Sequence, residues 1–115
     1  MEYNSRPETL RMAVQVTMYL NEADRWHHRP LHIELLNYLR KENVSGAGVY
    51  HAVAGFTGRQ AVHTTHLVDA GGQLPVVLTF IDTDEHIARV LPTLREMAPH
   101  RLIVRENVQI EQGLD

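Results

Sequence analysis

Cysteine is absent from this 115-residue chain, and its absence excludes several kinds of chemistry. Without a thiol there is no disulfide bond, no thiolate nucleophile and no zinc or iron–sulfur site with cysteine ligands. The composition is compatible with a reducing compartment, and we expect a cytoplasmic location. No positively charged start followed by an apolar stretch suggests a signal peptide.

Long apolar runs and clusters of one charge are also missing. A membrane-spanning helix needs about 20 apolar residues in succession, and the apolar runs here are far shorter. The chain carries 11 Lys and Arg against 14 Asp and Glu, which gives a net charge of −3 with neutral histidine. No run of Lys or Arg forms a footprint for nucleic acid or anionic lipid. We therefore expect no nucleic-acid partner and no insertion into a membrane.

The length and composition fit one small globular domain. Hydrophobic residues make up 43% of the chain and charged residues 22%, as in ordinary folded proteins. A domain of this size buries a modest share of its surface, so self-association would help to stabilise it. We expect a flexible leader over residues 1–9, one domain over residues 10–111 with a long loop at about 57–73, and a tail over residues 112–115.

Hydrophobic periodicity predicts four strands. Residues 10–20 alternate apolar and polar side chains, which is typical of a half-buried strand. Three further strands are expected over residues 48–56, 74–82 and 102–110, and Glu106-Asn107 is the place where the last could be interrupted.

Two helices separate these strands. The first has Pro30 in its first turn and ends near Glu42, and the second follows the third strand. Asp82 and Glu85 are expected to cap the second helix, in which Pro92 should remove one backbone hydrogen bond. The order β-α-β-β-α-β predicts an α+β, ferredoxin-like sandwich, an antiparallel sheet with two helices on one face. The other sheet face is either solvated or covered by copies of the chain.

Short motifs, spread in order over nearly the whole chain, resemble the DUF190 family of PII-like signalling proteins. They are Arg29-Pro30-Leu31, Ser45-Gly46-Ala47-Gly48-Val49, Ala54-Gly55-Phe56, Leu74-Pro75-Val76-Val77 and Ile81-Asp82-Thr83. The segment that opens the T-loop of PII proteins is similar to Gly55-Phe56-Thr57-Gly58-Arg59-Gln60 followed by His63-Thr64, with Thr57 inserted here.

The resemblance implies a homotrimer with its sheets inward and a small effector, typically an adenine nucleotide, in the clefts between subunits. It implies that the nucleotide is bound by Gly55, Phe56, Gly58, Arg59, Gln60 and Arg101. It also implies that a transporter or enzyme partner is contacted by T-loop residues, namely Arg59, Gln60, His63, Thr64 and His66. We therefore expect a regulatory protein and not an enzyme. We expect Phe56 to pack in the core more than to stack on a base.

Two features depart from the PII pattern. The Gly-rich phosphate loop is reduced to Ala98-Pro99-His100, and the positions expected to hold two arginines on the last strand carry Gln109 and Glu111. Because a triphosphate needs several cationic contacts, AMP, ADP, a cyclic nucleotide or a small anion is easier to hold here than ATP. The cations that remain near the shortened loop are Arg101 and Arg105.

Eight histidines keep a metal-binding alternative open. CutA-type trimers share the architecture, and His63 and His66 could form a metal-binding pair in the T-loop. His28 and His32 would share a helix face only if the first helix began before Pro30. No metal motif with fixed spacing is present, so we expect no metal ligand, and surface histidines are the simpler interpretation. A structural adaptor without a small ligand is a further alternative.

Overall fold

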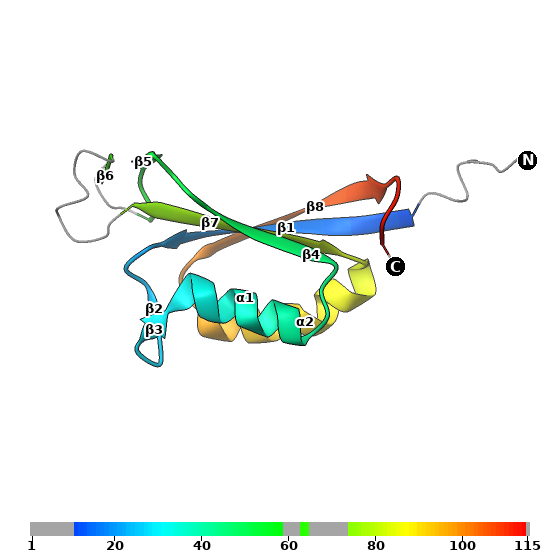
Figure 1. Ribbon diagram of the computed structural model, residues 1–115, viewed down its shortest axis with the longest axis horizontal. Coiled ribbons are helices and arrows are strands. Elements are labelled where there is room, and N and C mark those ends of the chain that lie inside the picture. Colours follow the sequence, from blue (N-terminus) through cyan, green and yellow to red (C-terminus); the bar gives the residue numbers. More distant parts are fainter. Residues whose placement is uncertain (1–10, 59–62, 65–73, 115) are drawn as a thin grey trace, which may run out of the picture.

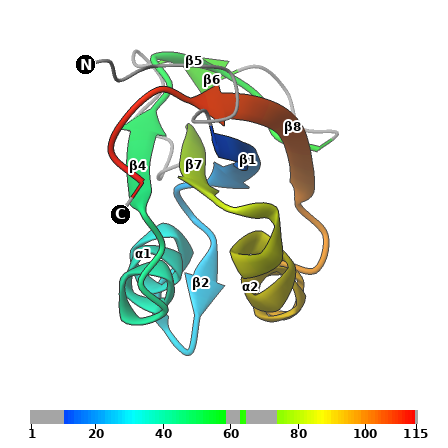
Figure 2. The ribbon, with the colours of Figure 1, turned by 90° about the vertical axis from the view of Figure 1, so that its right-hand side faces the viewer.

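The computed structural model describes residues 11–58, 63–64 and 74–114. A four-stranded antiparallel sheet forms one layer, and both long helices cover the same face of it (Figure 1, Figure 2). The sheet order is β4-β7-β1-β8, with bounds β1 Arg11–Asn21, β4 Gly46–His51, β7 Pro75–Asp82 and β8 Leu102–Ile110. The helices are α1 Leu31–Lys41 and α2 Asp84–Met97. The predicted α+β, ferredoxin-like fold is confirmed.

Strand β1 lies at the centre of the sheet and turns every second side chain toward the helices, as its alternating pattern predicts. Met12 shares that face but is exposed, because at this point β1 pairs with β8 alone. The core between sheet and helices consists mainly of Val14, Val16, Met18, Leu20, Leu35, Leu39, Val76, Leu78, Phe80, Ile87, Val90 and Leu94.

The predicted strand over residues 48–56 is two separate pieces. Strand β4 ends at His51, and β5 (Ala54–Gly55) pairs instead with β6 (His63–Thr64), outside the main sheet. The N–H of Ala52 still donates to the carbonyl of Pro75 at 3.0 Å, but Pro75 has no N–H with which to continue the ladder. Gly55 has a φ of 151°, and a Cβ there would lie 3.1 Å from Cγ of Pro75. The segment predicted to be the T-loop therefore begins with a strand that pairs outside the main sheet.

Helix α2 begins with a different cap from the one predicted. The side chain of Thr83 accepts a hydrogen bond from the N–H of His86 at 3.2 Å, so Thr83 is the N-cap. Asp82 instead accepts from the N–H groups of Ser45 (2.9 Å) and Thr83 (2.6 Å). The predicted Asp82–Glu85 capping pair is wrong, because the Asp82 carboxylate joins the end of β7 to the start of β4. The helix continues through Pro92, which lies on its exposed side.

The polar stretch after β1 contains a small hairpin of β2 (Arg25–Trp26) and β3 (Arg29–Pro30). His27 and His28 form its tip with φ values of 52° and 70°. Trp26 is half-buried and packs against the core. Pro30 is the N-cap of α1, one residue before the position in the first turn that the sequence suggested.

Strand β8 runs without the interruption considered at Glu106-Asn107, since both residues pair with β1. Its outward side belongs to the sheet face opposite the helices. Large apolar side chains are exposed on that face, including Leu102 at 61% and Tyr50 at 62%, with Tyr19 and Val104 beside them in the register.

Candidate functional site

Three connections meet at one end of the molecule: the turn after β1, the base of the T-loop and the loop after α2 (Figure 1). A cavity of about 290 Å³ lies between them and is lined by Tyr19, Phe56, Thr57, Gly58, His100, Arg101 and Leu102. We call it the T-loop cavity. Three of the predicted nucleotide-binding residues, Phe56, Gly58 and Arg101, therefore lie around one space, although Arg101 is far from the other two in the chain.

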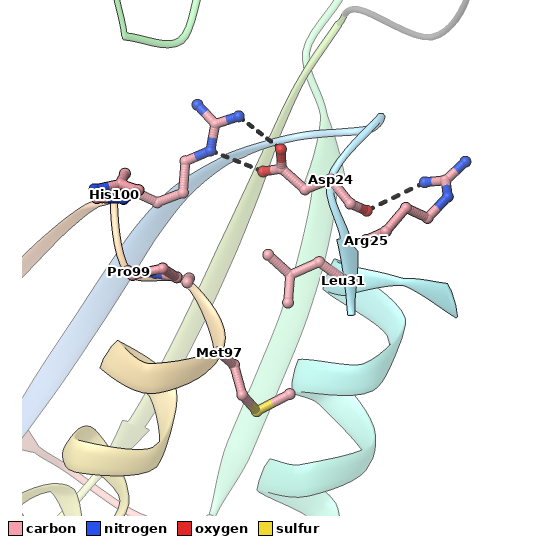
Figure 3. Close-up of a pocket in the computed structure, with 8 residues that line it drawn as sticks. Asp24, Arg25, Leu31, Met97, Pro99 and His100 are labelled. Carbon is pink, nitrogen blue, oxygen red and sulfur yellow. Dashed lines mark hydrogen bonds and ion pairs between the residues drawn. The ribbon is translucent and has the colours of Figure 1, made fainter. Parts of the chain in front are cut away.

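A second cavity of about 360 Å³, the turn cavity, lies on the other side of the loop after α2. Figure 3 shows Asp24 and Arg25 on one side of it and Pro99 and His100 on the other. Its apolar lining comes from the start of α1 and the end of α2. His100 and Arg101 line both cavities, so this short loop separates them.

Arg101 is held by a bidentate ion pair. Its Nε donates to Oδ2 of Asp24 at 2.8 Å and its Nη2 donates to Oδ1 at 2.6 Å. Both side chains are largely buried, with exposed fractions of 22% for Arg101 and 17% for Asp24. Paired fork contacts of this kind are short and fix the orientation of the guanidinium. Arg101, predicted to contact phosphate, therefore lines the T-loop cavity with its charge already neutralised by a carboxylate of the same chain.

The same turn is tied to the base of the T-loop. Asp24 also accepts from the N–H of Asn21 at 3.0 Å. The side-chain amide of Asn21, only 1% exposed, donates to Oγ1 of Thr57 at 3.2 Å. At the far end of the loop, Glu22 and Leu74 exchange two hydrogen bonds, backbone to backbone at 3.0 Å and backbone to carboxylate at 3.1 Å. Both ends of segment 58–73 are thus held by Asn21 and Glu22.

The outcome for the other predicted site residues is mixed. Gly58 has a φ of 63°, a conformation that favours glycine, with open space around its Cα. Phe56 is 58% exposed, so the expectation that it packs in the core is wrong for the single chain. Its ring lines the T-loop cavity because β5, the strand before it, pairs with β6 and not with the main sheet. Arg59, Gln60 and His66 lie outside the described residues, and His63 and Thr64 form β6.

Arg105 does not join this site. Its Nη2 donates to Asp84 at 2.6 Å, at the N-terminal end of α2. Gln109 and Glu111 line a separate cavity of about 350 Å³ at that same end, together with Ser45 and the C-terminal segment. Within one chain, these positions of the last strand are remote from Arg101.

The structure brings together two histidines that the sequence did not pair. The rings of His32 on α1 and His51 on β4 lie edge to face, 5.5 Å apart between centroids. Burial, the neighbouring His51 and the charge of Arg25 lower the pKa of His32 although the charge of Glu22 acts to raise it. His28 stands at the hairpin tip and not on the helix of His32. Within the part of the chain that is described, no group of three His, Asp or Glu side chains could hold a metal ion.

Sequence reasoning missed Asn21, Asp24 and Thr57, which organise the site. In the sequence, the turn after β1 is only a break in alternation, and Thr57 is only an insertion. The inserted Thr57 could have indicated such a contact, because a polar side chain that becomes buried beside a glycine-rich corner needs a hydrogen-bond partner. Its partner, 36 positions away, is not readable from spacing.

Comparison with known proteins identifies the family. The model of DUF190, a family of uncharacterised conserved proteins, matches residues 13–110. The chain belongs to this family. A UPF0166 protein of Methanocaldococcus jannaschii is 30% identical over 97 residues, which cover 84% of this chain and 89% of the relative. A UPF0166 protein of Aquifex aeolicus is 28% identical over 94 residues, which cover 81% of this chain and 88% of that relative.

Solved structures confirm that this DUF190 protein has a PII-like fold. CPII of Thiomonas intermedia K12, a nitrogen regulatory PII-like protein bound to ADP, AMP and bicarbonate, superposes with a TM-score of 0.68 at 12% identity, covering 90% of this chain and 92% of CPII. A candidate PII-like signalling protein of Thermus thermophilus gives a TM-score of 0.61 at 22% identity, covering 90% of this chain and 94% of the other. Among the described residues, no helix is long and apolar enough to cross a membrane.

Proposed function

We propose that this DUF190 protein is a cytoplasmic PII-like regulatory protein, not an enzyme, that binds an adenine nucleotide or a small anion in the T-loop cavity. The observation that carries the proposal is the meeting of Phe56, Gly58 and Arg101 around one cavity. The fold supports it, because CPII, which has the same fold, was solved with ADP, AMP and bicarbonate.

The lining of the T-loop cavity suits a nucleotide of low charge. Tyr19, Phe56 and Leu102 supply apolar surface against which a base can pack, and Arg101 supplies a cation for phosphate. Among the described residues around the two cavities, Arg25 and Arg101 are the arginines, and Arg25 already donates to the carbonyls of Glu22 and Asp24. Because so few cationic side chains are available, we expect the cavity to bind AMP or ADP more tightly than ATP.

We further propose that three copies assemble through the sheet face that the helices leave uncovered. Tyr19, Tyr50, Leu102 and Val104 expose apolar surface on that face, and packing against other copies would remove it from water. The number three is implied by the resemblance to PII proteins. The cleft between neighbours would then complete the T-loop cavity, which is open in the single chain.

The T-loop, in this proposal, carries the state of the cavity to a transporter or enzyme. Thr57 both lines the cavity and accepts the hydrogen bond from Asn21, so ligand and loop base share a residue. A ligand that orders the loop lowers the entropic cost of docking it on a partner.

The proposal is tested by calorimetric titration of the purified protein with AMP, ADP, ATP, cyclic AMP and bicarbonate. We expect AMP or ADP to bind and to raise the free energy of unfolding by about 2.7 kcal/mol at a hundredfold excess over Kd. Arg101→Gln should abolish nucleotide binding, whereas Arg105→Gln, whose side chain pairs with Asp84 at the start of α2, should leave it unchanged. If none of these ligands binds, the nucleotide and anion proposal is wrong. Sedimentation velocity should give a trimer, and a monomer at working concentration would contradict the shared cleft.

A further inference from the structure

The Asp24 carboxylate accepts hydrogen bonds from the guanidinium edge of Arg101 to which a phosphate group would also bind. Nε and Nη2 of Arg101 both donate to this carboxylate, in the bidentate arrangement that arginine makes with phosphates. The backbone N–H of Asn21 donates to the same carboxylate, which fixes Asp24 independently of Arg101. Asp24 is therefore a preformed anion that lines the turn cavity and is paired with Arg101, which also lines the T-loop cavity.

An anionic ligand can meet this arrangement in two ways. It can approach the remaining N–H groups of Arg101, with the Asp24 carboxylate still in place, or it can displace Asp24 from the guanidinium. In the first case the ligand is repelled by a nearby like charge. In the second case it leaves a largely buried carboxylate without its counter-ion. Both costs oppose binding, and the first grows with each negative charge on the ligand.

We propose that Asp24 sets the charge selectivity of the nucleotide site, so that it favours AMP over ADP and ADP over ATP. This inference rests on the proposed function, because it concerns the same site. Asp24 acts through repulsion and through its hold on Arg101, and it is a specificity-determining residue for the number of phosphates. The absence of further cations from the shortened Ala98-Pro99-His100 loop acts in the same direction.

The experiment measures the dissociation constants of AMP, ADP and ATP for the parent protein and for Asp24→Asn. Asparagine keeps the size of the side chain and one oxygen for the N–H of Asn21, but it removes the charge. We expect tighter binding by about threefold for AMP, about tenfold for ADP and about thirtyfold for ATP, because each added phosphate charge is relieved of the same repulsion. The ratio between ATP and AMP is the decisive quantity.

Asp84→Asn is the matched control. Asp84 also pairs with an arginine at 2.6 Å, and its substitution changes the net charge by the same amount. It lies at the opposite end of α2, a helix of 14 residues that spans about 20 Å. We expect the three dissociation constants of Asp84→Asn to stay within about twofold of the parent, since a charge that far away is largely screened. If Asp24→Asn and Asp84→Asn bound the nucleotides more tightly by similar factors, the effect would be one of net charge, and the proposal would be overturned.

Weaker nucleotide binding by Asp24→Asn would also overturn the proposal. If Asp24 only positions Arg101, the variant loses affinity for all three nucleotides by a similar factor. An unchanged ratio between ATP and AMP contradicts charge selectivity in the same way. If the parent itself binds no nucleotide, the proposed function fails, and that outcome is distinct because it appears before any variant is compared. Thermal unfolding checks that Asp24→Asn is folded, and Asp24→Ser repeats the test if it is not.

Discussion

A carboxylate surrounded by hydrogen-bond donors lies near each end of helix α2, Asp82 near its start and Asp24 near its C-terminal end. At its N-terminal end, the Asp82 carboxylate accepts from the N–H and hydroxyl of Ser45, from the N–H of Thr83 and pairs with His86 at 2.9 Å. At its C-terminal end, the Asp24 carboxylate accepts from Arg101 and from the N–H of Asn21. Each end thus holds a carboxylate that backbone and side-chain donors surround.

The difference lies in what surrounds each carboxylate. Asp82 is 5% exposed and joins β7 to the start of β4, so its donors belong to the fold. Asp24 lines a cavity, and its partner Arg101 lines two. We therefore expect Asp82 to contribute to stability, whereas Asp24, under the proposed function, contributes to the choice of ligand. Substitutions at both ends of the helix and in the turn beside Asp24 measure what these groups contribute.

Removal of Asp82 should have the largest effect on stability. Asp82→Ala leaves the N–H groups of Ser45 and Thr83 without their acceptor, and we expect it to lower the free energy of unfolding by about 3 kcal/mol. Urea denaturation measures the loss, and Asp82→Asn should lose less because it keeps one acceptor. Nucleotide affinity of the folded fraction should not change. A loss below about 1 kcal/mol would contradict the structural role of this end.

The pKa of Asp82 adds a pH dependence at the same end. Burial alone would raise it, but the hydrogen bonds from Thr83 and Ser45 and the charge of His86 outweigh burial and hold the pKa below its usual range. A carboxyl group whose pKa is lowered by folding stabilises the native state above its unfolded pKa. That contribution is lost as the pH falls through the folded value, below about 4. Denaturation of Asp82→Asn between about pH 5 and about pH 3 should show a smaller loss than the parent.

Asn21→Ala should have the next largest effect, at the other end. The substitution removes a buried donor to Thr57, and we expect a loss of about 2 kcal/mol in urea denaturation. It should also speed proteolytic cleavage within residues 58–73, because one end of that segment loses its tie to the turn. Asn37→Ala is the control, since Asn37 is exposed and makes one long contact of 3.5 Å to Glu34. Equal cleavage rates in the two variants would mean that Asn21 does not hold the loop base.

The same comparison explains what the sequence could predict. Strand β1 and the buried stripe of α2 are predictable because their apolar spacing is local. The cavity is predictable only in part, through the resemblance at Gly55–Gly58. Its polar network depends on Asn21 meeting Thr57 and on Asp24 meeting Arg101, which are 36 and 77 positions apart. The spacing of apolar residues cannot predict such contacts, because they form only when the folded sheet brings the ends of its strands together.

A smaller effect is expected from His32, which lies beside the turn. Its pKa is lowered mainly by burial and by His51, so the neutral form fits the folded chain better than the charged form. Since folding lowers this pKa, its contribution to stability is full above about pH 6.5 and is lost as the pH falls below that value. His32→Gln should flatten the decline in melting temperature between about pH 7 and about pH 5. His51→Gln should give an intermediate slope, and an unchanged slope in both variants would contradict this role.

Asp84→Asn should have the smallest effect, although Asp84 makes a contact to arginine as short as that of Asp24. The exposed fractions of Asp84 and Arg105 are 75% and 46%, so water and salt screen the pair. Asp84 also lies in the first turn of α2, where a negative charge stabilises the helix modestly. We expect a loss of about 0.5 kcal/mol in urea denaturation, which largely disappears at about 0.5 M NaCl. A loss as large as that of Asp82→Ala would contradict the view that enclosure, and not contact distance, decides what a carboxylate contributes at the two ends of this helix.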